Sequence, residues 1–427
     1  MSSVTVTSSQ QVISDAKQPD GSAGVSATCG KQLSLFSRFC QRLVHGRLST
    51  LKNGQICLHD QTGRFVLGEN TLGDLKATIS IRNPRFYRRL VTGRDLGLAE
   101  AYLDGDFDCD DLTSLFRIFC RNLEWHNTFG KTLEWATIGA ARMGYWLARN
   151  TRSGSRRNIG AHYDLGNEFF QLFLDPSMMY SSAIFEDPSM SLVDAQTARL
   201  DETCRRLQLK ASDHLLEIGT GWGGFAIHAA KNFGCRVTTT TISENQFRDA
   251  QQRVASAGLS DRVTVLQLDY RDLTGTFDKL VSLEMIEAVG PQFYDQYFAT
   301  CARLLKANGR MLLQAIVIPE QRYPEYLKSV DFIQKYIFPG GSLPSVTAMQ
   351  NSITRNSSLR LLSIDDFAEG YARTLREWRR NFLLRLDDVR QLGYSERFIR
   401  MWDYYLTYCE GAFEEKAVGV VQAVWGR

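Results

Sequence analysis

The chain has 427 residues, of which 44% are hydrophobic and 23% charged, and its formal net charge is +3. This length accommodates two or three domains of an ordinary globular protein, and so small a charge gives no indication of nucleic-acid binding. Nine cysteines without a Cys-x-x-Cys pair indicate neither a disulfide framework nor a metal site, which suits a reducing cytoplasm. Because no signal-peptide pattern and no apolar run of 18 residues are present, any membrane contact is expected to be peripheral.

The first part of the chain predicts a tail, a small α+β domain and a linker. Residues 1–30 are polar and lack periodicity, which indicates disorder. The domain spans 31–150, and its aromatic side chains suit either a plain core or a groove for an alkyl chain. Residues 151–158 are polar, basic and glycine-containing, as linkers are. The expected elements are strands at Gln55–His59, Arg64–Leu67 and Ala77–Ile81, and helices from Lys31 and at Phe86–Val91, Ala99–Leu103, Leu112–Leu123 and Asn127–Arg149.

Residues 159–427 alternate between apolar strands and amphipathic helices, as a doubly wound parallel sheet requires. The alternating pattern of Ala417–Trp425 predicts an antiparallel strand at the edge of that sheet. The expected fold class is therefore α/β, with a Rossmann-like sheet. The expected parallel strands are Asp213–Ile218, Cys235–Thr241, Arg262–Leu268, Lys279–Leu283 and Arg310–Ile318, with helices at Leu192–Leu207, Glu244–Ala257 and Tyr294–Leu305.

The first of these strands ends in Glu217-Ile218-Gly219-Thr220-Gly221-Trp222-Gly223-Gly224. Glycine permits positive φ and lets the backbone approach a ligand, so this segment predicts a strand, a sharp turn and a helix that starts near Trp222. The spacing does not complete the G-x-G-x-x-G fingerprint of dinucleotide sites. E-x-G-x-G-x-G is the signature of S-adenosylmethionine (SAM) methyltransferases, and the alternative is an ordinary glycine-rich turn.

Two aromatic-rich stretches, 319–350 and 365–415, lie outside the minimal sheet. They are large enough to line an apolar pocket, which would imply an apolar methyl acceptor. The alternative is that they form extra core and surface helices. Two arginine clusters suit either anionic headgroups or solvated helix faces. The clusters are Arg82, Arg85, Arg88, Arg89 and Arg94, and Arg373, Arg376, Arg379, Arg380 and Arg385.

Eight ordered blocks give the chain a resemblance to a known family over roughly residues 64–427. The blocks are Ala161–Asn167, Leu174–Pro176, Met179–Ser181, Ile218–Gly224, Thr241–Gln246, Met285–Gly290, Tyr336–Gly341 and Cys409–Phe413. With them the chain resembles the bacterial cyclopropane-fatty-acyl-phospholipid synthases, relatives of the mycolic acid cyclopropane synthases. The resemblance implies SAM as methyl donor and a cis-unsaturated acyl chain of a membrane phospholipid as acceptor. It also implies an N-terminal lipid-binding domain and a homodimer at the inner face of the membrane.

The resemblance also implies which residues contact SAM. In most methyltransferases an acid after the second strand holds the ribose hydroxyls, whereas here that place is threonine-rich and the Gln246 amide takes the role. The implied SAM contacts are Tyr180, Ser181, Gly219, Gly221, Trp222, Gly223, Thr241, Ser243, Gln246, Asp269 and Tyr270.

The chemistry of the implied reaction requires a base. When an alkene attacks a sulfonium methyl group, a carbocation is left on the chain, so the site must be dry, must stabilise positive charge and must accept a proton. Glu287 follows the fourth strand and is placed for this role, although a surface acid that caps the next helix is the alternative. The resemblance implies that this glutamate holds a bicarbonate ion, which acts as the base.

The chain departs from the family around that anion. Ser182 stands where the family has cysteine, Gln314 where it has histidine, and Arg379 where it has tyrosine, while Glu287 remains and Ala288 replaces a second histidine. Ser, Gln and Arg still suit an anion, but the changes leave bicarbonate and ring closure open. Cys409 matches the cysteine assigned as an active-site residue of the family, and a buried core thiol is its alternative.

Four functions remain possible at this stage. They are a cyclopropane synthase, a SAM-dependent methyltransferase that gives methyl- or methylene-branched acyl chains, a small-molecule methyltransferase, and a SAM-binding membrane-associated protein without activity. The lipid domain and the aromatic insertions argue against the third, and the intact cofactor motifs and Glu287 argue against the fourth.

Overall fold

The computed structural model describes residues 34–73, 75–123, 151, 154 and 165–427. Their contacts divide the chain into two compact units. Unit 1 comprises the described part of Met1–Gly144 with Ser329–Ile337 and Phe382–Ala417, and unit 2 comprises the described part of Tyr145–Lys328 with Phe338–Asn381 and Val418–Arg427. The units therefore interleave along the chain, whereas the sequence-based domains were continuous. The tail at 1–30, the helix at Asn127–Arg149 and most of the linker lie outside the described residues.

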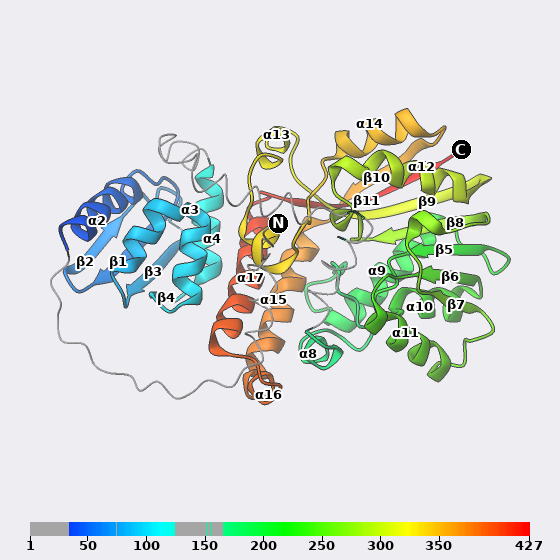
Figure 1. The fold of residues 1–427 in the computed structure, drawn as a ribbon, viewed down its shortest axis with the longest axis horizontal. Helices are drawn as coiled ribbons and strands as arrows, with labels where there is room; N and C mark the ends of the chain where they lie inside the picture. The colour runs from blue at the N-terminus through cyan, green and yellow to red at the C-terminus, as the bar shows by residue number, and fades with distance from the viewer. Residues whose placement is uncertain (1–33, 74, 124–150, 152–153, 155–164) are drawn as a thin grey trace, which may run out of the picture. The chain divides into compact units, whose positions relative to one another are not determined.

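Unit 1 contains a four-stranded sheet of order β2-β1-β3-β4 (Figure 1). β1 pairs antiparallel with β2 and parallel with β3, and the three expected strands are confirmed. The hairpin turn is held by Asp60 Oδ1, which accepts the backbone N–H of Thr62 at 2.7 Å and of Gly63 at 3.2 Å. The strands are β1 (Gln55–Asp60), β2 (Gly63–Leu67), β3 (Lys76–Ile81) and β4 (Phe107–Cys109).

The helices of unit 1 are α2 (Leu35–Leu48), α3 (Arg85–Leu103), α4 (Leu112–Arg121), α16 (Leu386–Gln391) and α17 (Glu396–Glu414). α3 includes both helices expected between residues 86 and 103, which are separated by Arg94 at φ 49°. α17 lies so close to α4 that a Cβ atom at Gly411 would stand 2.8 Å from Phe116 Cβ. The second half of the predicted insertion at 365–415 thus packs within this unit.

Unit 2 contains a seven-stranded sheet of order β10-β11-β9-β8-β5-β6-β7 (Figure 1). The five strands from β9 to β7 are parallel, as expected. β11 is antiparallel but lies between β9 and β10, so its predicted edge position is wrong and the exposed β10 forms the edge. The strands are β5 (His214–Ile218), β6 (Arg236–Thr240), β7 (Val263–Leu266), β8 (Phe277–Leu283), β9 (Leu305–Val317), β10 (Arg360–Asp366) and β11 (Gly419–Gly426).

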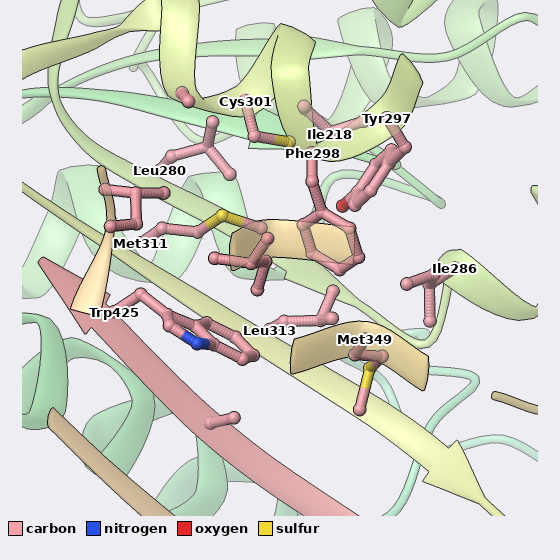
Figure 2. Close-up of a cluster of buried hydrophobic side chains, with 14 of the residues drawn as sticks. Ile218, Leu280, Ile286, Tyr297, Phe298, Cys301, Met311, Leu313, Met349 and Trp425 are labelled. Carbon is pink, nitrogen blue, oxygen red and sulfur yellow. The ribbon is translucent and has the colours of Figure 1, made fainter. Parts of the chain in front are cut away.

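Helices cover both faces of this sheet. Because strand side chains alternate between faces, Leu216 packs with α12 (Tyr294–Leu304) and α14 (Val346–Asn356). Leu215 packs on the other face with α9 (Leu192–Leu207), α10 (Gly224–Phe233) and α11 (Glu244–Ser256). Figure 2 shows the first cluster, in which Phe298 of α12 lies over Leu313 of β9 and Trp425 of β11. Both faces of β5 are therefore buried, and its carboxyl end holds the glycine loop. A further helix, α15, spans Ala368–Leu384.

No helix among the described residues has the length and apolar character needed to span a bilayer.

Candidate active site

The glycine loop, Gly219–Gly223, joins the buried end of β5 to α10. Gly219, Gly221 and Gly223 have φ values of 104°, 52° and 80°, which side chains rarely adopt. A Cβ atom at Gly219 would lie 3.2 Å from Met285 Cγ, whereas one at Gly221 would meet nothing within 4 Å. The loop is thus packed at Gly219 and open at Gly221, which fits close approach of a ligand to the backbone there.

Glu217 holds the base of this loop. Its Oε2 accepts the Thr239 hydroxyl at 2.5 Å, and the hydroxyl oxygens of Thr239 and Thr220 lie 2.7 Å apart. The backbone N–H groups of Gly219 and Thr220 both donate to Thr240 O at 3.1 Å. Burial raises the pKa of Glu217 to about 8. The acid of the E-x-G-x-G-x-G pattern therefore supports the loop and its neighbour β6.

Aromatic rings lie beside the loop. Trp222 is buried, and its Nε1 donates to Asn167 Oδ1 at 2.7 Å. The Phe170 ring lies 4.9 Å from the Trp222 ring and 5.3 Å from the Tyr180 ring. The Tyr180 ring is also 5.3 Å from that of Trp378 on α15. Two predicted SAM contacts, Tyr180 and Trp222, are therefore joined through Phe170.

The segment after β6 brings three further predicted contacts together. The Thr241 hydroxyl donates to Gln246 Oε1 at 2.9 Å, and Ser243 Oγ accepts the Gln246 N–H at 3.3 Å as the N-cap of α11. All three are buried. Since no hydrogen bond within the described structure uses Gln246 Nε2, this amide retains donors for a polar ligand such as a ribose hydroxyl.

Asp269 and Tyr270 follow β7 but are already engaged. Arg271 binds the Asp269 carboxylate through two side-chain nitrogens, at 2.8 and 2.5 Å. The Tyr270 ring packs against that of Tyr297 at 5.3 Å. Their SAM contacts remain predictions, and this ion pair does not provide a free carboxylate for them.

Two buried glutamates, hereafter the carboxylate pair, follow β8. Glu284 accepts three hydrogen bonds: its Oε1 from Ser182 N at 2.9 Å and Gln314 Nε2 at 2.6 Å, and its Oε2 from the Tyr371 hydroxyl at 2.7 Å. Burial raises its pKa, whereas these donors and the positive charge of Arg199 act in the opposite direction. Glu284 is thus placed in a site built for an anion.

Glu287, the second member of the pair, has a different environment. Its Oε1 accepts Ile316 N at 2.6 Å, while its Oε2 is buried without a hydrogen-bond partner. Burial, and then the charge of Glu284, raise the pKa of Glu287 to about 8. The three donors and the charge of Arg199 favour the ionised form of Glu284, whereas Glu287, with a single backbone donor beside a carboxylate, favours its protonated form.

Arg199 on α9 is a buried cation whose positive charge acts on Glu284. It is fully buried, and its Nη2 donates to Ser181 Oγ and Gln196 Oε1, both at 3.0 Å. Its Nε and Nη1 have no partner. Burial lowers its pKa to about 10, so it remains a cation at neutral pH. The predicted SAM contact Ser181 is thus held by a buried guanidinium.

The predicted catalytic residues differ in whether they contact the carboxylate pair. Ser182 contributes its N–H to Glu284, but its hydroxyl donates to Ala183 O at 3.1 Å. Gln314 contacts Glu284 directly and is held by Gln422 Nε2 at 3.0 Å. Arg379 is partly buried on α15, beside Trp378, and its role stays a prediction.

Cys409 belongs to unit 1, on α17, whereas the carboxylate pair belongs to unit 2. Burial, and then the charge of Asp331, raise the pKa of its thiol. A thiolate is therefore disfavoured, which supports the core-thiol alternative.

Sequence reasoning missed Glu284, Arg199 and Tyr371. Glu284 had a signal, because it directly follows a buried strand, as functional acids in parallel sheets do. Arg199 had a weaker one, since it lies in the buried stripe of α9, between Gln196 and Thr203. Tyr371 had none, because only the tertiary structure brings α15 to β8.

Comparison with known proteins identifies the family of the chain. The family model for mycolic acid cyclopropane synthetase matches residues 150–423. The cyclopropane-fatty-acyl-phospholipid synthase of Escherichia coli K12 is 40% identical over 83% of this chain and 89% of its own. The tuberculostearic acid methyltransferase UfaA1 of Mycobacterium tuberculosis is 37% identical over 78% of this chain and 79% of its own.

Among solved structures, the mycolic acid cyclopropane synthase CmaA1, complexed with SAH and CTAB, has a TM-score of 0.60 and 31% identity. It covers 64% of this chain and 98% of its own. The SAM-methyltransferase fold expected from the sequence is confirmed. On the family model and the extent of these matches, the chain belongs to the mycolic acid cyclopropane synthetase family.

Proposed function

We propose that this enzyme transfers a one-carbon unit from SAM to the cis double bond of a phospholipid-bound acyl chain and forms a cyclopropane ring. The observation that carries the proposal is the carboxylate pair. Its member Glu284 directly precedes Met285 in sequence, and Met285 packs against Gly219 of the glycine loop. The name and 40% identity of the Escherichia coli relative support the same substrate class.

The site's residues fit SAM and the chemistry required. SAM supplies an electrophilic methyl group on a positively charged sulfur. Gly221 offers open backbone, Gln246 a free amide and Tyr180 an aromatic ring, so unit 2 presents groups for both polar and apolar parts of such a ligand. The Tyr180 and Trp378 rings and the Glu284 carboxylate suit an acyl carbocation, because π faces and anions stabilise positive charge where water is excluded.

The experiment is a fatty-acid profile by mass spectrometry. Purified full-length protein is incubated with SAM and vesicles of cis-unsaturated phospholipid, and the methyl esters are analysed before and after mild hydrogenation. We expect a product one carbon larger that resists hydrogenation, which is the cyclopropane. A product that takes up hydrogen retains a double bond and would contradict ring closure.

A methyl- or methylene-branched product is the second candidate, and one observation favours it. Ala288 and Gln314 stand at positions where the family that the chain resembles has histidine, so the surroundings of the anion that accepts the proton differ. The 37% identical relative named a methyltransferase points the same way. Hydrogen uptake in the same assay would select this candidate.

We also infer that α2 contacts the inner face of an anionic membrane. Leu35, Phe36, Phe39 and Leu43 are 85%, 56%, 57% and 43% exposed. At helical spacing they form one stripe, distinct from the buried stripe of Cys40, Val44 and Leu48. The exposed Arg38, Arg42 and Arg88 have no ion-pair partner among the described residues. An apolar stripe flanked by arginines is suited to an interfacial helix on anionic lipid.

Vesicle sedimentation tests this contact. The double variant Phe36→Ser/Phe39→Ser is expected to bind vesicles that contain phosphatidylglycerol about 10-fold more weakly. Leu361→Ser/Ile364→Ser, on the exposed β10, is the matched control and should bind normally. Equal binding by parent and α2 variant would contradict the assignment. A homodimer, which the resemblance implies, remains a proposal that sedimentation velocity of the same protein would test.

A further inference from the structure

Glu284 has a backbone conformation that a glutamate rarely adopts. Its φ is 50°, in the left-handed region, directly after the last residue of β8. Such strain persists only where surrounding contacts hold it, and it is concentrated at functional sites. At this position the contacts are the three hydrogen bonds to its carboxylate. The conformation therefore directs this side chain into a prepared set of donors.

Those donors come from three separate parts of unit 2. Ser182 lies two residues after Tyr180, Gln314 lies on β9, and Tyr371 lies on α15. Arg199 adds a buried positive charge that acts on the same carboxylate. A backbone N–H, an amide and a phenol directed at one carboxylate, with a guanidinium nearby, form a site that stabilises negative charge.

A dissolved bicarbonate ion does not fit this arrangement. The resemblance assigns the anion to positions that include Ser182 and Gln314, and in the family the position of Ile316, which this chain retains, belongs to the same set. Here the N–H of Ser182 and the amide of Gln314 donate to Glu284, and the N–H of Ile316 donates to Glu287. The Ser182 hydroxyl donates to a carbonyl. A second anion would therefore lie against a carboxylate while its donors were already engaged, which electrostatic repulsion opposes.

We propose that the Glu284 carboxylate takes the place of that anion and is itself the base that removes the proton from the alkylated acyl chain. The inference rests on the proposed function. In the step, a C–H bond of the newly attached methyl group breaks and its proton binds a Glu284 carboxylate oxygen. The C–H electron pair forms the third ring bond to the cationic carbon. The carboxylate becomes a neutral carboxylic acid, the product is neutral, and the proton is later released to solvent.

The position and strength of Glu284 both suit this step. Met285, the next residue in sequence, lies beside Gly219 of the glycine loop. A carbocation is a very strong acid, so a base that already accepts three hydrogen bonds is sufficient. Glu287 stays protonated beside it and avoids a second negative charge. Glu284 is therefore a catalytic residue in this proposal, and Arg199 is a positioning residue.

The test compares full-length parent and variants on phospholipid vesicles in carbonate-free buffer, with and without added bicarbonate. The parent is expected to turn over equally in both. Glu284→Gln is expected to lose at least about 100-fold in turnover while its SAM affinity, measured by calorimetry, stays within about twofold. Glu202→Gln, whose carboxylate pairs with Arg206 elsewhere on α9, is the control and should behave as the parent does.

Glu284→Gly provides a second, independent readout. Glycine accepts the positive φ without strain and removes the carboxylate, so this variant should fold and should regain turnover when formate or bicarbonate is added. Rescue by a small anion is not expected of a residue with only a structural role. A parent that needs bicarbonate, an active Glu284→Gln variant, or a Glu284→Gly variant that no anion rescues would overturn the base assignment alone. A parent without any one-carbon lipid product would overturn the proposed function as well.

Discussion

The glycine loop and the carboxylate pair lie at the carboxyl ends of neighbouring parallel strands, β5 and β8, but they are built in different ways. The loop is continuous in sequence and offers backbone, and its open point at Gly221 depends on the lack of a side chain. The pair offers side chains whose partners come from distant segments. The first should govern SAM binding and the second turnover, so variants in the two regions should separate these properties.

The largest effect is expected for Gly221→Val. A side chain at φ 52° is strained, and it would occupy the open space beside the loop. We expect SAM affinity to fall by at least about 100-fold in a calorimetric titration. Gly258→Val is the matched control, because Gly258 also has positive φ and open surroundings but lies after α11. Undiminished SAM affinity in Gly221→Val would refute the role of the loop.

Glu287→Gln should lower turnover and leave SAM affinity nearly unchanged, the reverse of the loop variant. Glutamine can still accept the Ile316 N–H, but it lacks the carboxyl proton that the protonated Glu287 can donate. Turnover is expected to fall by about 100-fold, while SAM affinity changes by less than about twofold. Steady-state kinetics on lipid vesicles and a SAM titration measure the two quantities. Normal turnover would remove Glu287 from the catalytic site and leave Glu284 as the only functional member of the pair.

A smaller effect is expected for Arg199→Met. Without the buried guanidinium, the pKa of Glu284 should rise further, because Arg199 now favours its ionised form. Since the base must be ionised, the acid limb of the kcat/KM profile should move to higher pH, with about 10-fold lower activity near neutrality. Arg199→Lys retains the charge and should shift the limb less. An unchanged profile in Arg199→Met would show that the cation does not act on the pair.

The contrast between a loop that is continuous in sequence and a carboxylate pair with distant partners explains how much could be predicted from sequence. β5, the glycine loop and α10 were located correctly because their signals are local: an apolar strand, alternate glycines and a helical stripe. The contacts of Glu284 are not local, since its partners Ser182, Gln314 and Tyr371 are 102, 30 and 87 residues away. β11 was placed at the edge because its alternating pattern reveals its orientation but not its neighbours. β10 gave no strand signal, because its residues do not alternate between apolar and polar.

The last expected effect concerns the base of the glycine loop and appears in stability rather than activity. The pKa of Glu217 is raised to about 8 in the folded chain, against an ordinary value of 4.5. Between these values the folded chain holds a proton that the unfolded chain has lost, so stability should fall as pH rises from 5 to 8 and level off above 8.

Glu217→Gln removes this titration. Its free energy of unfolding should fall less steeply than that of the parent over this interval, by up to about 1.4 kcal/mol per pH unit. Urea unfolding of both proteins at pH 5, 6, 7 and 8 measures the difference. Glu202→Gln is the control: Glu202 forms a partly exposed ion pair with Arg206, and its replacement should leave the slope unchanged. Equal slopes in the parent and Glu217→Gln would mean that Glu217 is ionised in the folded chain, and the loop would then rest on a buried charge that Arg199 must compensate.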